Sequence, residues 1–317
     1  MKKLAFYFIA LFLIPSLVFT GCKKDTEETF DAQKELTTYL VAQNLDLNTI
    51  LGGFVMPAPD NGDVSAKYLI DIRTADEFAQ GHIEGAHRVN VADILTEAAK
   101  ATKPILVICK TGQTATHTTT LLRLSGYADA QALKWGMSGW NSTLDVWTPA
   151  IGSIAAGHAN WTSDAAPTNL TFSSPKFTVS TTVPADILKE RVAAILTEGF
   201  KTVTASDVLE NPGNFFINNY FSEADYTAFG HIKGAYRINP LLISDGTMNY
   251  LDPAKAVVPY CYTGQTSAAI CAYLRVIGYD AKSMLFGMNK LNNGSSAWTS
   301  NKWSAAVAKN LPIVTGN

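Results

Sequence analysis

The sequence predicts an α/β protein made of two copies of one domain, each a parallel β-sheet flanked by helices. Short apolar runs that end at polar residues alternate with helical stretches, a pattern typical of a parallel sheet covered on both faces. The same motifs also occur twice in the same order. A length of 317 residues suits two domains, and 47% apolar with 16% charged residues suits a folded chain with a sizeable core.

The repeat is clearest in two motifs. Gly81–Arg88 reads Gly-His-Ile-Glu-Gly-Ala-His-Arg, and Gly230–Arg237 reads Gly-His-Ile-Lys-Gly-Ala-Tyr-Arg. Cys109–Thr114 reads Cys-Lys-Thr-Gly-Gln-Thr and matches Cys261–Thr266, Cys-Tyr-Thr-Gly-Gln-Thr, 152 residues further on. Matches that keep their order and spacing indicate a duplicated domain.

These observations divide the chain into five parts. Residues 1–21 are expected to be an export signal, 22–33 a polar tether, 34–150 the first domain and 185–317 the second. The stretch 151–184 is rich in small and polar residues and has neither a helical nor a strand period, so it is expected to be a linker.

The N-terminus has the charge and hydropathy pattern of an export signal. Lys2 and Lys3 precede an apolar run over Leu4–Val18, which is short for a transmembrane helix. Phe19-Thr20-Gly21-Cys22 follows the run, and small residues before a cysteine resemble the lipobox. That resemblance implies lipidation of Cys22, export to the bacterial cell envelope and a membrane anchor. The alternative is a plain secretory signal with an incidental cysteine.

The predicted elements follow in order. Apolar residues at helical spacing predict an N-terminal helix within Phe30–Ile50. Tyr68–Ile72 and Pro104–Cys109 are short apolar runs that predict strands of the first domain, and Asn214–Ile217 and Ala256–Tyr260 predict their counterparts in the second.

Each cysteine loop joins a predicted strand to a predicted helix. Cys109 directly follows a strand, and the next helix is expected to start around residues 114–116. Gly112 lets the loop curl so that its amides converge. Free N–H groups and the helix dipole should lower the pKa of the thiol and stabilise a thiolate or persulfide anion. The same reasoning applies to Cys261 and Gly264.

The first copy contains four motifs in order: Asp71-x-Arg73, Gly81–Ala86, the Cys109–Thr114 loop and Trp135–Trp140. Together they resemble a rhodanese domain. The second copy has the middle two and a looser ending, Phe286-Gly287-Met288. The resemblance implies the rhodanese fold and a sulfurtransferase reaction in which a cysteine carries the transferred sulfur.

The resemblance also implies the roles of individual residues. Cys109 and Cys261 stand where the catalytic cysteine stands, with a small sulfur-containing donor and a thiol or cyanide acceptor as substrates. No cofactor or metal is expected, since no Cys/His spacing suits zinc and no phosphate fingerprint occurs. The expected substrate-binding residues are Lys110, Thr111, Gly112, Gln113, Thr114, Asp71 and Arg73 in the first copy, and Tyr262, Thr263, Gly264, Gln265 and Thr266 in the second.

The two copies differ in charge. The second has Asn219 and Phe221 where the first has its acidic–basic pair. Its loop carries neutral Tyr262 in place of Lys110, a cation expected to attract an anionic donor such as thiosulfate. We therefore expect Cys109 to be the better thiosulfate site.

Other interpretations remain open at this stage. Phosphatases of this fold have arginine at the sixth position after the cysteine, where this chain has Ala115 or Ser267, which favours sulfur over phosphate. A non-catalytic binding lipoprotein in a cell-envelope complex, with an envelope protein partner, is the rival function. A net charge of −2 without basic clusters speaks against nucleic-acid binding.

Several conspicuous side chains have ordinary explanations. Asp71 and Arg73 are as well explained by a structural salt bridge as by contact with substrate. The two motif histidines fit turns that hydrogen-bond to nearby backbone. His117 is expected to be a solvated helix residue, and Cys271 to pack in the core. Three cysteines besides Cys22 argue against a simple disulfide framework.

Overall fold

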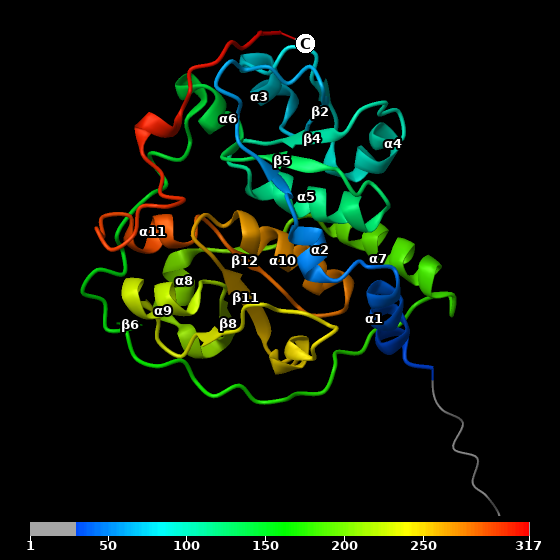
Figure 1. Ribbon diagram of the computed structural model, residues 1–317, viewed down its shortest axis with the longest axis vertical. Helices are drawn as coiled ribbons and strands as arrows, with labels where there is room; N and C mark the ends of the chain where they lie inside the picture. The colour runs from blue at the N-terminus through cyan, green and yellow to red at the C-terminus, as the bar shows by residue number, and fades with distance from the viewer. Residues whose placement is uncertain (1–29, 317) are drawn as a thin grey trace, which may run out of the picture. The chain divides into compact units, whose positions relative to one another are not determined.

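The computed structural model describes residues 30–316, and from Asp31 onward they belong to one compact unit (Figure 1). The predicted signal, Cys22 and most of the tether lie outside the described residues. Within the described range no helix is both long and apolar enough to cross a membrane.

The first half contains a five-stranded sheet in which every strand pair is parallel. Ile105–Ile108 is buried throughout, as its continuous apolar sequence predicts, and it pairs with Tyr68–Asp71 in the register Tyr68↔Ile105. In sheet order the strands are β1 (Val55–Met56), β5 (Gln131–Leu133), β4 (Ile105–Ile108), β2 (Tyr68–Asp71) and β3 (His87–Arg88).

The second half repeats this strand order. Strands β10, β8 and β11 form one sheet, and β12 and β7 form a parallel pair. Val257 joins the two, because its N–H donates to Asp280 O at 2.7 Å and its carbonyl accepts from Lys282 N at 2.9 Å. The order is then β7 (Thr202–Val203), β12 (Ser283–Met284), β11 (Ala256–Tyr260), β8 (Phe215–Asn219) and β10 (Tyr236–Arg237). The predicted α/β class with parallel sheets flanked by helices is confirmed.

Helices begin where the sequence supplies caps. Thr74 and Glu77 form a capping box at the start of α3, and Pro184 opens α7 at a position where proline is tolerated. The first half has α1 (Ala32–Ala42), α2 (Leu47–Leu51), α3 (Ala75–Gln80), α4 (Ile94–Ala98), α5 (Gln113–Leu124) and α6 (Gly136–Trp140). The second has α7 (Pro184–Glu198), α8 (Ala205–Glu210), α9 (Glu223–Phe229), α10 (Gln265–Val276) and α11 (Met288–Asn292). Short 3-10 turns cover Val91–Asp93, Ser142–Leu144, Pro212–Asn214, Thr247–Tyr250 and Ala305–Val307.

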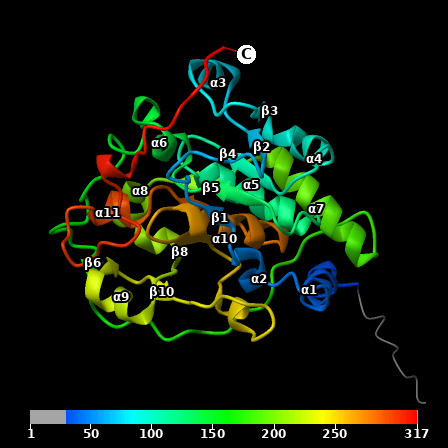
Figure 2. The ribbon, with the colours of Figure 1, turned by 45° about the horizontal axis from the view of Figure 1, so that its top comes forward.

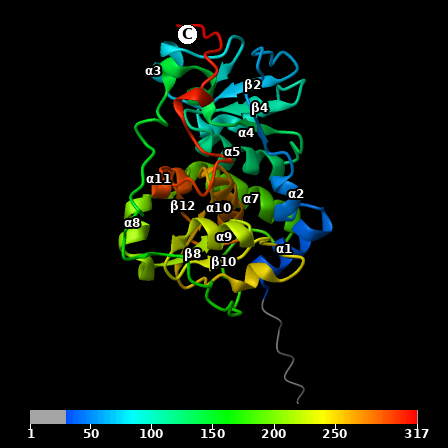
Figure 3. The ribbon, with the colours of Figure 1, turned by 60° about the vertical axis from the view of Figure 1, so that its left-hand side comes forward.

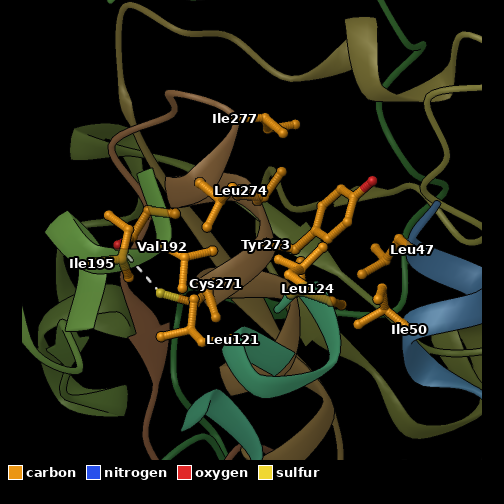
Figure 4. Packing of buried hydrophobic residues seen from close by; sticks show 14 of the residues in the cluster. Leu47, Ile50, Leu121, Leu124, Val192, Ile195, Cys271, Tyr273, Leu274 and Ile277 are labelled. Carbon is orange, nitrogen blue, oxygen red and sulfur yellow. Dashed lines mark hydrogen bonds between the residues drawn. The ribbon is translucent and has the colours of Figure 1, made fainter. Parts of the chain in front are cut away.

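Helices α5 and α10 pack against each other between the two sheets (Figures 1 and 3). They lie in a hydrophobic cluster that draws residues from both halves, so the core is shared. Burying each aliphatic side chain of this kind stabilises the fold by about 1.5–3 kcal/mol. Figure 4 shows members of this cluster from both halves: Leu47, Ile50, Leu121, Leu124, Val192, Ile195, Cys271, Tyr273, Leu274 and Ile277.

The connection over 151–183 packs on the second half. Its strand β6 (Trp161–Thr162) pairs in antiparallel fashion with β9 (His231–Ile232). Gly152 N also donates to Asn289 O at 2.9 Å. The segment therefore follows the surface of the half that comes after it.

The C-terminal tail packs back on the first half (Figure 2). Val314 forms an antiparallel bridge with His82, and Trp140 Nε1 donates to Pro312 O at 2.8 Å. Leu311 is buried in the cluster that contains Trp140. The tail thus covers part of the surface of the first half. The domain boundaries at 34–150 and 185–317 stay a prediction.

Candidate active site

Cys109 lies between β4 and α5 and is almost completely buried, at 4% exposure. Its Sγ accepts hydrogen bonds from Gly112 N at 3.1 Å and Ala115 N at 3.3 Å. Gly112 has φ +83°, a left-handed conformation that glycine adopts without strain. The loop therefore curls around the sulfur and directs backbone amides at it.

The pKa of Cys109 differs from the expectation. Burial raises the pKa of the thiol, and the amides of Ala115, Thr111 and Gly112 lower it by a smaller amount. The charge of Asp71 raises it further. The predicted lowering is wrong because a thiolate at this position loses its hydration, and the loop amides replace only part of it.

The segment after β5 donates hydrogen bonds to the backbone carbonyls of the cysteine loop. Met137 N donates to Cys109 O at 2.8 Å, and Ser138 N donates to Lys110 O at 3.1 Å. A Cβ on Gly136 would lie 2.3 Å from Cys109 O, so only glycine permits this approach. This support was not predicted, although an aromatic-Gly-Met sequence at equivalent places in both copies was its signal.

Asp71 and Arg73 form a buried salt bridge, with 2.6 Å between Arg73 Nη2 and Asp71 Oδ2. Arg73 also donates to the carbonyls of Gly81 at 2.8 Å and Glu77 at 3.2 Å. The pair fixes the turn after β2 to α3 and the following loop. Of the two explanations open from the sequence, these contacts favour the structural salt bridge.

Lys110 is exposed, and its charge is already paired. Its Nζ lies 2.7 Å from Glu77 Oε1, which helps to lower the pKa of that carboxyl against the effect of burial. Thr111 and Thr114 are half-buried, and the Thr111 hydroxyl accepts from Gln113 N at 3.3 Å. Of the predicted substrate contacts in this loop, Lys110, Thr111 and Thr114 are the ones that reach solvent.

Cys261 occupies the corresponding place between β11 and α10 and is 2% exposed. Its Sγ accepts from Ser267 N at 3.4 Å and lies 3.8 Å from Ser267 Oγ. Gly264 again has a left-handed conformation, and Met288 N donates to Cys261 O at 3.0 Å. The backbone frame is repeated, with longer hydrogen bonds to the sulfur than at Cys109.

The surroundings of Cys261 are aromatic rather than ionic. Phe221 stacks on Tyr262 with 4.5 Å between ring centroids, and the Tyr262 hydroxyl donates to Asp225. Asn219 Nδ2 donates to the Tyr260 hydroxyl at 2.7 Å. The side chains that replace the Asp71–Arg73 pair are therefore neutral, and their contacts named above are with tyrosines.

Comparisons with known proteins find similarity in the first half of the chain. A sequence profile of the rhodanese-like domain matches residues 58–143. The thiosulfate sulfurtransferase GlpE of Pseudomonas fluorescens (strain SBW25) is 33% identical over 78 residues, which are 24% of this chain and 71% of that protein. The chain belongs to the rhodanese family. Its matched region contains β2, β4 and Cys109.

Similarity to other known proteins is weaker. GlpE of Shewanella oneidensis is 29% identical over 75 residues, 23% of this chain and 74% of that protein. A crystal structure of a thiosulfate sulfurtransferase from Pseudomonas aeruginosa is similar at 15% identity and TM-score 0.29, covering 86% of this chain and 48% of that one. The 3-mercaptopyruvate sulfurtransferase from Leishmania major is similar at 14% identity and TM-score 0.28, covering 74% and 72%.

Two residues predicted to bind substrate, one in each cysteine loop, turn their side chains into the protein instead. Gln113 and Gln265 are 1% and 2% exposed, and each side chain reaches the other half of the molecule. Thr263 accepts from Gln265 N at 3.1 Å, and Thr266 is half-buried. The sequence placed these glutamines in the right loops and could not show which way they face.

The remaining conspicuous residues divide into confirmed and wrong predictions. Cys271 is a buried free thiol in the core, as predicted, and burial raises its pKa to about 12. His82 and His231 bond to the carbonyls of Phe78 at 2.9 Å and Tyr226 at 3.0 Å, also as predicted.

His117 is fully buried, so its predicted solvation is wrong. The packing of α5 against the second half places it there. The described part of the chain contains no cluster of residues that would hold a metal ion.

Proposed function

We propose that this rhodanese is a sulfurtransferase that moves sulfane sulfur from a donor such as thiosulfate to a thiol or cyanide through a persulfide on Cys109. The observation that carries the proposal is the pair of loop amides that donate to Cys109 Sγ at 3.1 and 3.3 Å. Such amides stabilise negative charge on a thiolate and equally on a persulfide.

The reaction has two displacements. The Cys109 thiolate attacks the outer sulfur of thiosulfate, a new S–S bond forms, the S–S bond of thiosulfate breaks, and sulfite leaves. The acceptor then attacks the terminal sulfur, the persulfide S–S bond breaks, and the Cys109 thiolate returns. Burial raises the pKa of Cys109, so the first step requires prior loss of the thiol proton to solvent.

The second half is proposed to be a second rhodanese-like domain with a weaker or different activity. Its strand order and cysteine loop support the first part of this proposal. The amide donor to Cys261 Sγ, Ser267 N at 3.4 Å, is more distant than the two amides at Cys109, and this distance and the packing of Phe221 on Tyr262 support the second. We therefore rank Cys109 above Cys261 for an anionic donor.

The test compares Cys109→Ser with Cys261→Ser. Incubation with thiosulfate should add about 32 Da per reactive cysteine, reversibly by cyanide. Cys109→Ser should remove most cyanide-coupled turnover, and Cys261→Ser less. Cys271→Ser, which changes a core thiol, is the matched control. Turnover that survives Cys109→Ser and disappears in Cys261→Ser would reverse the ranking.

A binding module is the second candidate, and it applies best to the second half. Asn219, Phe221 and Tyr262 replace the charged groups of the first site with packed neutral ones. If neither reduced, folded loop gains sulfur from thiosulfate or from an organic persulfide, the sulfurtransferase proposal fails. A binding role in a cell-envelope complex, with an envelope protein as partner, would then be favoured.

We also propose that the protein is exported and anchored through lipid on Cys22. The support is the apolar run over Leu4–Val18, which is followed within four residues by Gly21-Cys22. Cys22→Ser should release the protein from the membrane fraction or leave it unprocessed. Unchanged mass and unchanged membrane association would contradict the anchor.

A further inference from the structure

The two cysteine loops lie against each other. Gln113 begins α5 and Gln265 begins α10, each directly after a left-handed glycine. A Cβ on Gly264 would lie 2.2 Å from Gln113 Oε1, and one on Gly112 would lie 3.0 Å from Gln265 Cδ. Each glutamine side chain therefore occupies the space beside the opposite glycine.

Gln113 connects the first loop to the support of Cys261. Its Oε1 accepts from Phe286 N at 2.9 Å. Two residues later, Met288 N donates to Cys261 O at 3.0 Å. Gln113, in the first loop, thus fixes the Phe286–Met288 segment, which in turn donates to the carbonyl of Cys261.

Gln265 connects the second loop to the amide that faces Cys109. Its Nε2 donates to Thr111 O at 3.4 Å. Thr111 C=O and Gly112 N–H belong to one planar peptide unit, and that N–H donates to Cys109 Sγ at 3.1 Å. Trp147 Nε1 donates to the same carbonyl at 3.1 Å. Donors on the carbonyl fix the plane and so aim the N–H at the sulfur.

We propose that Gln113 and Gln265 are reciprocal positioning residues, each holding the cysteine site of the other loop. The proposal deepens the sulfurtransferase function and rests on it for its catalytic consequence. Both side chains are buried, so water cannot replace their hydrogen bonds when they are removed. Thr116 Oγ1 adds a further connection, since it lies 2.9 Å from Gln265 O and 2.8 Å from Gln113 O.

The experiment uses Gln113→Met and Gln265→Met in the full chain. Methionine keeps the length of the side chain and removes its amide. Gln131→Met is the control for loss of a glutamine amide elsewhere. Gln131 is half-buried, its Nε2 donates to Gly53 O at 2.8 Å and its Oε1 accepts from Lys67 Nζ at 2.6 Å, and it begins β5, away from the carboxyl end of β4 where the Cys109 loop starts. Peptide mass analysis then gives the rate at which each cysteine gains sulfur from thiosulfate.

We expect a crossed pattern, in which each substitution mainly slows the cysteine of the opposite loop. Gln113→Met should slow sulfur loading of Cys261 about tenfold and change that of Cys109 less than about twofold. Gln265→Met should slow Cys109 about threefold, a smaller effect because its bond is long and Trp147 still holds the carbonyl. Gln265→Met should also move the pH midpoint of Cys109 loading upward, which loosened packing alone would not do. The control should change neither rate.

Variants that slow only the cysteine of their own loop, or both cysteines equally, would overturn the proposal. Alkylation by iodoacetamide separates this outcome from failure of the proposed function. A crossed change in alkylation rates without sulfur loading supports the positioning role and refutes sulfur transfer. Uncrossed alkylation refutes the positioning role whether or not sulfur is transferred.

Discussion

The buried side chain of His117 should make the free energy of unfolding depend on pH. The residue lies in α5, fully buried, with its ring centroid 5.0 Å from that of Phe200. Within the described residues neither ring nitrogen has a hydrogen-bond partner. Burial, and after it the charge of Arg275, lowers the pKa of His117 from 6.5 to about 3.

The sign and size follow from linkage between protonation and folding. A lowered pKa means that the unfolded chain takes up a proton first, so stability is complete above pH 6.5 and is lost as pH falls toward 3. A pKa difference of one corresponds to about 1.4 kcal/mol. At pH 5 the free energy of unfolding should therefore be about 2 kcal/mol lower than at pH 7.5 because of His117 alone.

The assay is urea unfolding at pH 7.5 and pH 5.0 for the unchanged protein and His117→Leu. At pH 7.5 the variant should be at least as stable, because two unpaired buried nitrogens are removed. Between the two pH values it should lose about 2 kcal/mol less than the unchanged protein. His158→Leu is the control, since His158 is only half-buried and its Nδ1 accepts from Asn160 N at 3.1 Å. Equal losses in His117→Leu and the unchanged protein would refute the reasoning.

Three further predictions concern the first site. Burial raises the pKa of Cys109, so the rate of its sulfur loading should increase about tenfold per pH unit from pH 7 and still rise at pH 9. A rate that reaches a plateau below pH 8 would contradict this. Asp71→Asn leaves Arg73 buried without its charged partner and should lower the free energy of unfolding by about 3 kcal/mol in urea titrations. The double variant Asp71→Asn/Arg73→Leu removes the unpaired charge and should recover part of that loss. Gly136→Ala should destabilise the protein by about 3 kcal/mol or more, since φ is +60° and the new Cβ would meet Cys109 O, whereas Gly85→Ala, at φ +78° in open space, should cost about 1 kcal/mol.

The sequence was sufficient for features that depend on local patterns. Ile105–Ile108 and Ala256–Tyr260 are strands because short, mostly apolar runs that contain several β-branched residues fit the interior of a parallel sheet. The start of α5 at Gln113 falls within a residue or so of the expected position, because Gly112 marks the turn. The repeat placed equivalent loops at the carboxyl ends of equivalent strands.

The features that could not be predicted depend on contacts between the halves. His117 resembles a surface residue in the sequence, and only the packing of α5 against the second half buries it. Gln113 and Gln265 were placed in the loops, but their direction is set by partners more than 150 residues away. The pKa of Cys109 depends on a balance between burial and hydrogen bonds that a sequence does not contain.

The C-terminal tail affects when the protein can finish folding. The apolar surface around Trp140 receives Leu311, and the Trp140 indole receives the carbonyl of Pro312. Leu311 and Pro312 follow Trp140 by about 170 residues in the chain. During synthesis the surface around Trp140 therefore stays uncovered until these two residues have been made, so this part of the first half is among the last to become buried.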